Sequence, residues 1–126
     1  MTPKKPLLGL GNDILAISRM RQSIERHGQH LLNRLFTEKE QNYCLKHHDS
    51  APFFAGRFTA KEAVVKAFGT GFGHEISWHD VEILNDERGK PFVLLSAGVQ
   101  EKFQQPQLLI SISHCEEYAT AVAIWL

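Results

Sequence analysis

The stretch SAPFFAGRFTAKEAVVKAFG, residues 50–69, decides the fold. It opens with a serine and an early proline, which are typical of a helix start, and it ends at Gly69, a residue type that commonly stops a helix. Between these ends, four apolar side chains recur at the spacing of one helical face: Phe54, Phe58, Val65 and Phe68. The sequence therefore predicts one long core helix on which the other elements pack.

The segments on both sides of this helix predict an α+β fold. Helices are expected at 14–26, 37–47 and 96–105, a strand at 7–12, and hairpins at 81–95 and 108–126. The expected architecture is a mainly antiparallel sheet with helices packed on one side.

Two local signals in these segments are specific. Thr37 and Glu40 have the capping-box spacing, which predicts the start of the second helix. In the last strand, small side chains share one face and let a helix lie close to it: Ala119, Ala121 and Ala123.

Length and composition predict a single soluble domain covering residues 1–126. No stretch approaches the roughly 20 apolar residues of a membrane-spanning helix, and residues 1–6 lack the apolar region of a secretory signal, so a cytoplasmic location is expected. Fourteen basic and fourteen acidic side chains cancel, which gives no argument for a nucleic acid or an anionic membrane as partner. Cys44 and Cys115 have no metal-ligand spacing and are expected to be reduced.

Glu62 and Lys66 are the first pair in the core helix that points to chemistry. They lie four residues apart and therefore share one helical face. An exposed pair of this kind is common and contributes only about 0.3–0.5 kcal/mol, so a surface ion pair is the ordinary alternative. Lys61 falls near the centre of the apolar face, where a lysine must reach solvent or meet a partner.

Asp13 is the second acid of interest because it follows a glycine-rich strand. Alternation puts Gly9, Gly11 and Asp13 on one face, so nothing bulky separates the carboxylate from a ligand above it. The alternative is a helix cap, since aspartate suits that position and a helix is expected from residue 14. Asp13 and Glu62 together can hold one hard cation beside Lys66, an arrangement that phosphoryl transfer requires.

The glycine-rich loop 69–73 predicts a phosphate contact at the end of the core helix. The amides of Gly69 and Gly71 have no side chain to keep a phosphate away. The C-terminal end of a helix does not attract anions, so Lys66 and a metal ion must supply the attraction.

His114 and Cys115 lie at the end of a predicted strand. His114 continues the face of Ile110 and Ile112, where a structural histidine bonded to the backbone is the common alternative. A thiol hydrolase using Cys115 is a rival function, but strand neighbours point to opposite faces, so His114 is badly placed to activate the thiol. The other histidines lack zinc-binding spacing, and no structural zinc is expected.

Four blocks of the sequence, in order, resemble the small bacterial holo-acyl-carrier-protein synthase group of 4'-phosphopantetheinyl transferases. They are GLGNDI at 9–14 with Arg19 behind it, RFTAKEAVVKAFGTG at 57–71, the segment from HDV at 79–81 through GKP at 89–91, and SISH at 111–114 followed by Tyr118 and Ala119. The second block is highly specific, and the resemblance covers nearly the whole chain.

The resemblance implies an enzyme that moves the 4'-phosphopantetheine arm of coenzyme A to a serine of apo acyl carrier protein in fatty acid biosynthesis. Adenosine 3',5'-bisphosphate would be released. Asp13 and Glu62 would bind Mg²⁺ on the diphosphate, and Lys66 would neutralise or protonate oxygens as the bond breaks. The resemblance also implies a homotrimer with active sites at its subunit contacts.

For the donor, the resemblance implies that Arg57 and His114 bind the charged end of coenzyme A. The segment 89–91, with Lys90 and Pro91, would lie near the adenosine. Arginines on the first helix resemble the family's docking surface for an acidic carrier protein, and a solvated basic face is the alternative: Arg19, Arg21 and Arg26.

Two positions depart from the family pattern. Asn12 stands where relatives carry an apolar residue or threonine, and Ala16 stands where many carry an acid. The third metal contact and the general base therefore stay open. The alternative function is a non-catalytic module that binds coenzyme A or a nucleotide and needs no metal.

Overall fold

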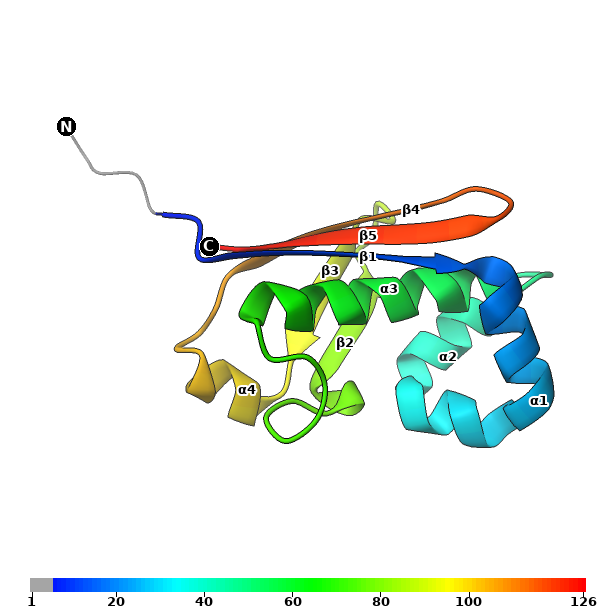
Figure 1. Cartoon of the computed structure of the whole chain (residues 1–126), viewed down its shortest axis with the longest axis horizontal. Helices are drawn as coiled ribbons and strands as arrows, with labels where there is room; N and C mark the ends of the chain where they lie inside the picture. Colours follow the sequence, from blue (N-terminus) through cyan, green and yellow to red (C-terminus); the bar gives the residue numbers. More distant parts are fainter. Residues whose placement is uncertain (1–5) are drawn as a thin grey trace.

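Figure 1 shows the computed structural model, which describes residues 6–126. The elements are β1 (Gly9–Ala16), α1 (Ile17–Leu35), α2 (Glu38–Leu45), α3 (Ala51–Phe68), the short 3-10 helix η1 (Trp78–Asp80), β2 (Val81–Asn85), β3 (Pro91–Leu95), α4 (Ala97–Lys102), β4 (Leu108–His114) and β5 (Tyr118–Trp125). Residues 1–6, considered above for a secretory signal, lie almost wholly outside the described range. No helix within residues 6–126 is both long and apolar enough to cross a membrane.

The predicted α+β class is confirmed, with two antiparallel sheets. β1, β5 and β4 form one sheet in that order, and β2 and β3 form a separate hairpin. Asp13 on β1 stands opposite Ala121 on β5, which stands opposite Ile112 on β4. Figure 1 shows α3 running along one face of the three-stranded sheet, and the predicted alanines of β5 are buried beneath it.

Close packing of α3 on β1 depends on two glycines. A Cβ atom at Gly11 would lie 2.0 Å from the carbonyl oxygen of Ala63, and one at Gly9 would lie 2.0 Å from that of Ala67. Because no side chain fits into such a gap, only glycine lets the helix lie against the strand. The space that was expected above these glycines for a ligand is therefore filled by the backbone of α3.

The core helix has its predicted bounds, and Gly69 ends it in a left-handed conformation with φ of 79°. The start of α1 was predicted wrongly. β1 continues to Ala16, because each residue up to Ala16 has a partner on β5, and the helix starts only at Ile17. It also runs past the predicted end to Leu35, with a local break at Gly28, because Leu32 and Leu35 bury their side chains in the core.

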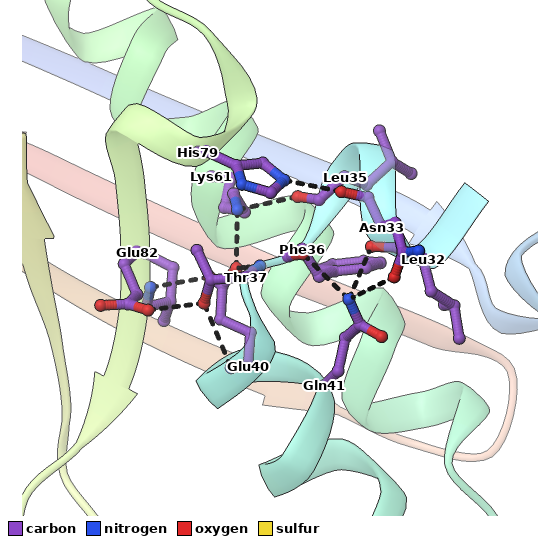
Figure 2. Close-up of polar contacts among 11 residues, drawn as sticks. Leu32, Asn33, Leu35, Phe36, Thr37, Glu40, Gln41, Lys61, His79 and Glu82 are labelled. Carbon is purple, nitrogen blue, oxygen red and sulfur yellow. Dashed lines mark hydrogen bonds and ion pairs between the residues drawn. The ribbon is translucent and has the colours of Figure 1, made fainter. Parts of the chain in front are cut away.

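The remaining predictions of local structure are confirmed with small shifts. The capping box of Thr37 and Glu40 is present at the start of α2, both hairpins form, and Ser96 caps α4, which is shorter than expected. Lys61 has the partner that its position requires. It is fully buried and pairs with Glu40 at 2.7 Å (Figure 2).

Candidate active site

Asp13 and Lys66 meet at the contact between β1 and α3. Lys66 Nζ lies 3.0 Å from Asp13 Oδ1 and donates to the carbonyl of Asn12 at 3.2 Å. The Asp13 side chain is 17% exposed and that of Lys66 is 48% exposed. Asp13 lies inside β1 rather than before a helix, so the capping alternative is excluded.

Glu62 completes a cluster of charges with these two residues. It lies one turn before Lys66 on α3 and is half-buried. Partial burial raises the pKa of Glu62, the charge of Asp13 raises it further, and the ammonium of Lys66 opposes both effects. The two acids therefore lie close enough to repel each other, as a shared cation site requires.

The donor set of this cluster suits magnesium. Within residues 6–126, no group of three or more His, Cys, Asp or Glu side chains is arranged to hold a metal. Mg²⁺ is commonly bound by one or two carboxylates, with phosphates and water as the other ligands. Asp13 and Glu62 match that pattern. Burial is the main cause of the raised pKa of Glu62, and a divalent cation would relieve the repulsion from Asp13 that adds to it.

Arg57 belongs to a second site. It lines a cavity of about 180 Å³ on the other side of α3. Its side chain is almost fully buried, its guanidinium lies 4.1 Å from the ring centroid of Tyr43, and it donates to Asn85 Oδ1. Its Nε is buried and has no hydrogen-bond partner among the residues that the structure describes. A guanidinium that belongs to the lining of a cavity is a ready site for an anion.

Other residues predicted to bind coenzyme A line this same cavity. His114, Pro91 and Gly89 form part of its wall, whereas Lys90 does not. The His114 ring packs edge-on against Phe53, with 5.4 Å between the ring centroids. The cavity thus combines an arginine, a histidine and aromatic surface, which fits a phosphorylated nucleotide.

The glycine loop after α3 is arranged differently from the prediction. The amide of Gly69 donates to the carbonyl of Lys66, and the amides of Thr70 and Gly71 both donate to that of Val65. These donors close the C-terminal end of α3 and are therefore already in use. A phosphate role for Gly69 and Gly71 stays a prediction, and their observed contribution is to end the helix.

The two groups of predicted residues lie on opposite flanks of α3. Asp13 is on β1 and His114 is on β4, with β5 between them. Neighbouring strands are about 4.8 Å apart, so the outer two strands are separated by about 10 Å, and α3 covers the space between them. One chain does not bring the acids and the arginine cavity together.

Comparison with known proteins decides the family. Residues 9–123 match the model of the 4'-phosphopantetheinyl transferase superfamily. The chain belongs to this superfamily. It is 58% identical over 118 residues to the holo-[acyl-carrier-protein] synthase of Protochlamydia amoebophila, covering 94% of this chain and 97% of that one. It is 52% identical over 120 residues to the Chlamydia pneumoniae protein of the same name, covering 95% and 98%.

Solved structures of the superfamily have the same fold. A Helicobacter pylori holo-[acyl-carrier-protein] synthase in complex with coenzyme A aligns with a TM-score of 0.86 and 32% identity, over 93% of this chain and 99% of that one. A Bacillus anthracis synthase in complex with CoA (3',5'-ADP) aligns with a TM-score of 0.81 and 36% identity, over 94% and 96%.

The basic helix of this 4'-phosphopantetheinyl transferase divides its arginines between two environments. Arg21 makes two hydrogen bonds to the carboxylate of Asp49, at 2.7 and 3.0 Å. Arg19 and Arg26 instead border a small polar groove on the same helix, together with His27. Two of the three predicted docking residues therefore share a surface, and the third is paired within the chain.

Sequence reasoning missed three residues around Arg57. Tyr43, Phe53 and Asn85 line the cavity, and two of them contact the guanidinium directly. They belong to α2, α3 and β2, and no motif links them in sequence. The only available signal was Arg57 itself, because an arginine on a buried face needs partners.

Proposed function

We propose that this chain transfers the 4'-phosphopantetheine arm of coenzyme A to a serine of apo acyl carrier protein, in fatty acid biosynthesis. Support comes from membership of the superfamily, from relatives named holo-[acyl-carrier-protein] synthase, and from neighbours solved with coenzyme A. The observation that carries the proposal is the cluster of Asp13, Glu62 and Lys66, which α3 and β1 bring together from distant parts of the sequence.

The reaction is a phosphoryl transfer. The serine oxygen forms a bond to the phosphorus that carries the pantetheine arm, and the bond from that phosphorus to the oxygen of the departing adenosine 3',5'-bisphosphate breaks. The serine loses its proton, and the leaving phosphate gains negative charge. Catalysis of such a step depends mainly on positioning and on stabilising charge.

In the proposed mechanism, Asp13 and Glu62 would hold Mg²⁺. The ion, when bound, would neutralise phosphate oxygens as charge develops on them. Lys66 is half-exposed, so its ammonium can leave Asp13 and bind or protonate the leaving oxygen. Before the substrate binds, the Asp13–Lys66 ion pair keeps the two side chains next to each other.

We also place the nucleotide of coenzyme A in the Arg57 cavity. Arg57, His114 and Pro91 line the same space. These groups suit a phosphate beside a purine ring. Lys90 is exposed beside the cavity, where it can add charge without forming its wall.

A homotrimer with active sites at its subunit contacts is part of the proposal. The acid cluster and the arginine cavity lie on opposite flanks of α3, so the acids of one subunit would face the cavity of the next. The outer face of the three-stranded sheet supports association, because it exposes apolar side chains: Leu10 at 61%, Ile14 at 64%, Leu109 at 49% and Tyr118 at 47%.

For the acceptor, we propose that an acidic carrier protein docks on α1. Arg19 and Arg26 border one groove, and Arg21 can contribute by exchanging Asp49 for a carrier carboxylate. Such contacts favour fast association that weakens with salt.

We assign the reaction to the cytoplasm, a compartment that suits the two free cysteines, Cys44 and Cys115.

The decisive experiment is intact mass spectrometry of apo acyl carrier protein incubated with this protein, coenzyme A and Mg²⁺. We expect the carrier to gain the mass of one phosphopantetheine arm. Omitting Mg²⁺, or adding a chelator, is expected to prevent the gain. Binding of coenzyme A without any transfer to several carriers would instead identify a non-catalytic binding module.

A further inference from the structure

Glu40 and Lys61 form an ion pair that is completely buried between helices and a strand (Figure 2). Lys61 Nζ lies 2.7 Å from Glu40 Oε1, and both side chains are 0% exposed. Lys61 also donates to the carbonyl of Leu35 at the end of α1, at 2.8 Å. A buried charge pair is costly to desolvate, and apolar residues of similar size often give equal or greater stability. Stability alone therefore does not explain the pair.

The Glu40 carboxylate uses both of its oxygens to join separate elements. Besides accepting from Lys61, Oε1 accepts from the amide of Thr37 at 2.8 Å. Oε2 accepts from the amide of Ile83 on β2, also at 2.8 Å. α2, α3 and β2 thus meet at one carboxylate, which fixes their positions relative to one another.

The same three elements supply Arg57 and its two partners. On α3, Arg57 lies one turn before Lys61 and therefore on the same side of the helix. On α2, Tyr43 lies about one turn after Glu40 and places its ring against the guanidinium at 4.1 Å. On β2, Asn85 lies two residues beyond the bonded amide, on the same face, and accepts from Arg57.

We propose that the Glu40–Lys61 pair positions Arg57 for the nucleotide end of coenzyme A. Neither residue of the pair lines the Arg57 cavity, so both act through the elements that they join. This inference rests on the proposed function and names the positioning residues of its nucleotide site. Holding three elements in register is a use of a buried ion pair that apolar packing, being non-directional, does not provide.

The acid cluster on the other flank of α3 depends on different contacts. There, the helix backbone lies against Gly9 and Gly11 of β1, with Lys66 bonded to Asp13. A change at the Glu40–Lys61 pair is therefore expected to affect nucleotide binding and to leave metal binding unchanged.

The test is Glu40→Gln in the full chain. The amide nitrogen of glutamine cannot accept a hydrogen bond, so either the link from Ile83 or both links from Thr37 and Lys61 are lost while the shape is kept. We expect the Kd of adenosine 3',5'-bisphosphate, measured by calorimetry, to rise about tenfold, as the loss of a buried bond to a charged group suggests. The KM for coenzyme A should rise with it. The kcat at saturating coenzyme A, and the Mg²⁺ concentration for half-maximal activity, should change by less than about twofold.

Phe103→Leu is the matched control for a general loss of stability. Phe103 packs on Phe68 at 4.3 Å and on Trp125 at 5.8 Å between ring centroids, at the other end of α3 from Arg57. This variant should be less stable and yet bind the nucleotide as the unchanged protein does. Equal weakening in both variants, or unchanged binding in Glu40→Gln, would overturn the positioning role.

A second variant covers the case in which Glu40→Gln does not fold. Glu40→Gln combined with Lys61→Met removes the uncompensated charge and should restore a folded chain. We expect this double variant to keep the weakened nucleotide affinity. An affinity equal to that of the unchanged protein would contradict the positioning role of the Glu40–Lys61 pair. If the unchanged protein bound coenzyme A but transferred nothing, the proposed reaction would fail while the positioning role stood.

Discussion

Two lysines of α3, five residues apart in sequence, each pair with a carboxylate in very different surroundings. Lys61 meets Glu40 at 2.7 Å with both side chains fully buried, and Lys66 meets Asp13 at 3.0 Å with its own side chain 48% exposed. The Glu40 carboxylate also accepts from two backbone amides, whereas Asp13 lies beside a second acid, Glu62.

The difference shows how burial separates an ion pair that is closed within the core from one that substrates can reach. The buried pair has its hydrogen bonds satisfied within the chain, so it cannot take part in chemistry without opening the core. The half-exposed pair has a lysine that can move and an excess of negative charge beside it. Only the second pair has capacity left for a metal and a phosphate.

The largest effect expected when the two ion pairs are disrupted is on the free energy of unfolding. Lys61→Met leaves Glu40 as an uncompensated buried charge and should lower the free energy of unfolding by about 3–5 kcal/mol. Lys66→Met should lower it by less than about 1 kcal/mol, because the exposed pair is screened by water. Urea denaturation of the two variants measures both losses in the free energy of unfolding. Equal losses would mean that burial does not distinguish the pairs.

The next effect is on activity. Glu62→Gln keeps the shape of the side chain but removes a charge from the proposed metal site, so the transfer rate should fall about 100-fold, or roughly 3 kcal/mol in the barrier. Steady-state assays at saturating Mg²⁺ measure the loss, and circular dichroism checks that the fold is unchanged. Unaltered turnover would reject the metal role of Glu62.

A smaller effect is expected where α3 touches β1. Gly11→Ala puts a Cβ atom where the carbonyl of Ala63 lies, and the forced separation should cost about 1–3 kcal/mol of stability. The shift should also move Asp13 away from Glu62 and reduce the transfer rate. Gly98→Ala is the control, because a Cβ atom at Gly98 meets nothing within 4 Å in the described part of the chain. If both variants melted at the same temperature, close helix packing would not be what Gly11 provides.

The smallest effect concerns pH. Because the pKa of Glu62 is raised in the folded chain, the folded state holds this proton more tightly than the unfolded state does. The resulting stabilisation is present at low pH and is lost as pH rises from the ordinary carboxyl pKa through the raised one. Thermal melting across that range should show a steeper decline for the unchanged protein than for Glu62→Gln. A parallel decline in both would contradict the assignment.

Much of the fold was predictable because its signals are local. The capping box of Thr37 and Glu40, the helix end at Gly69 and the alanine face of β5 each follow from neighbouring residues. The boundary between β1 and α1 was not predictable in this way, since pairing with β5 overrides the helical pattern as far as Ala16.

The candidate site was predictable only in part. Asp13, Glu62 and Lys66 were named from the sequence, and the structure brings them together. The glycines before Asp13 were predicted to leave room for a ligand, and that prediction was wrong because the backbone of α3 lies there. A sequence does not tell whether a ligand or a helix fills the space above a strand. Tyr43 and Asn85 were missed, since contacts between distant segments leave no periodic signal.

By itself, the sequence determined the core helix, the α+β class and the charged residues that this chain offers for chemistry, because spacing along one element sets which side chains share a face. Only the tertiary structure decided which lysine was buried and which stayed accessible. It also placed the acids and the arginine cavity on opposite flanks of α3. These outcomes depend on which segments pack together, and packing sets burial, desolvation and the partners that each charge finds.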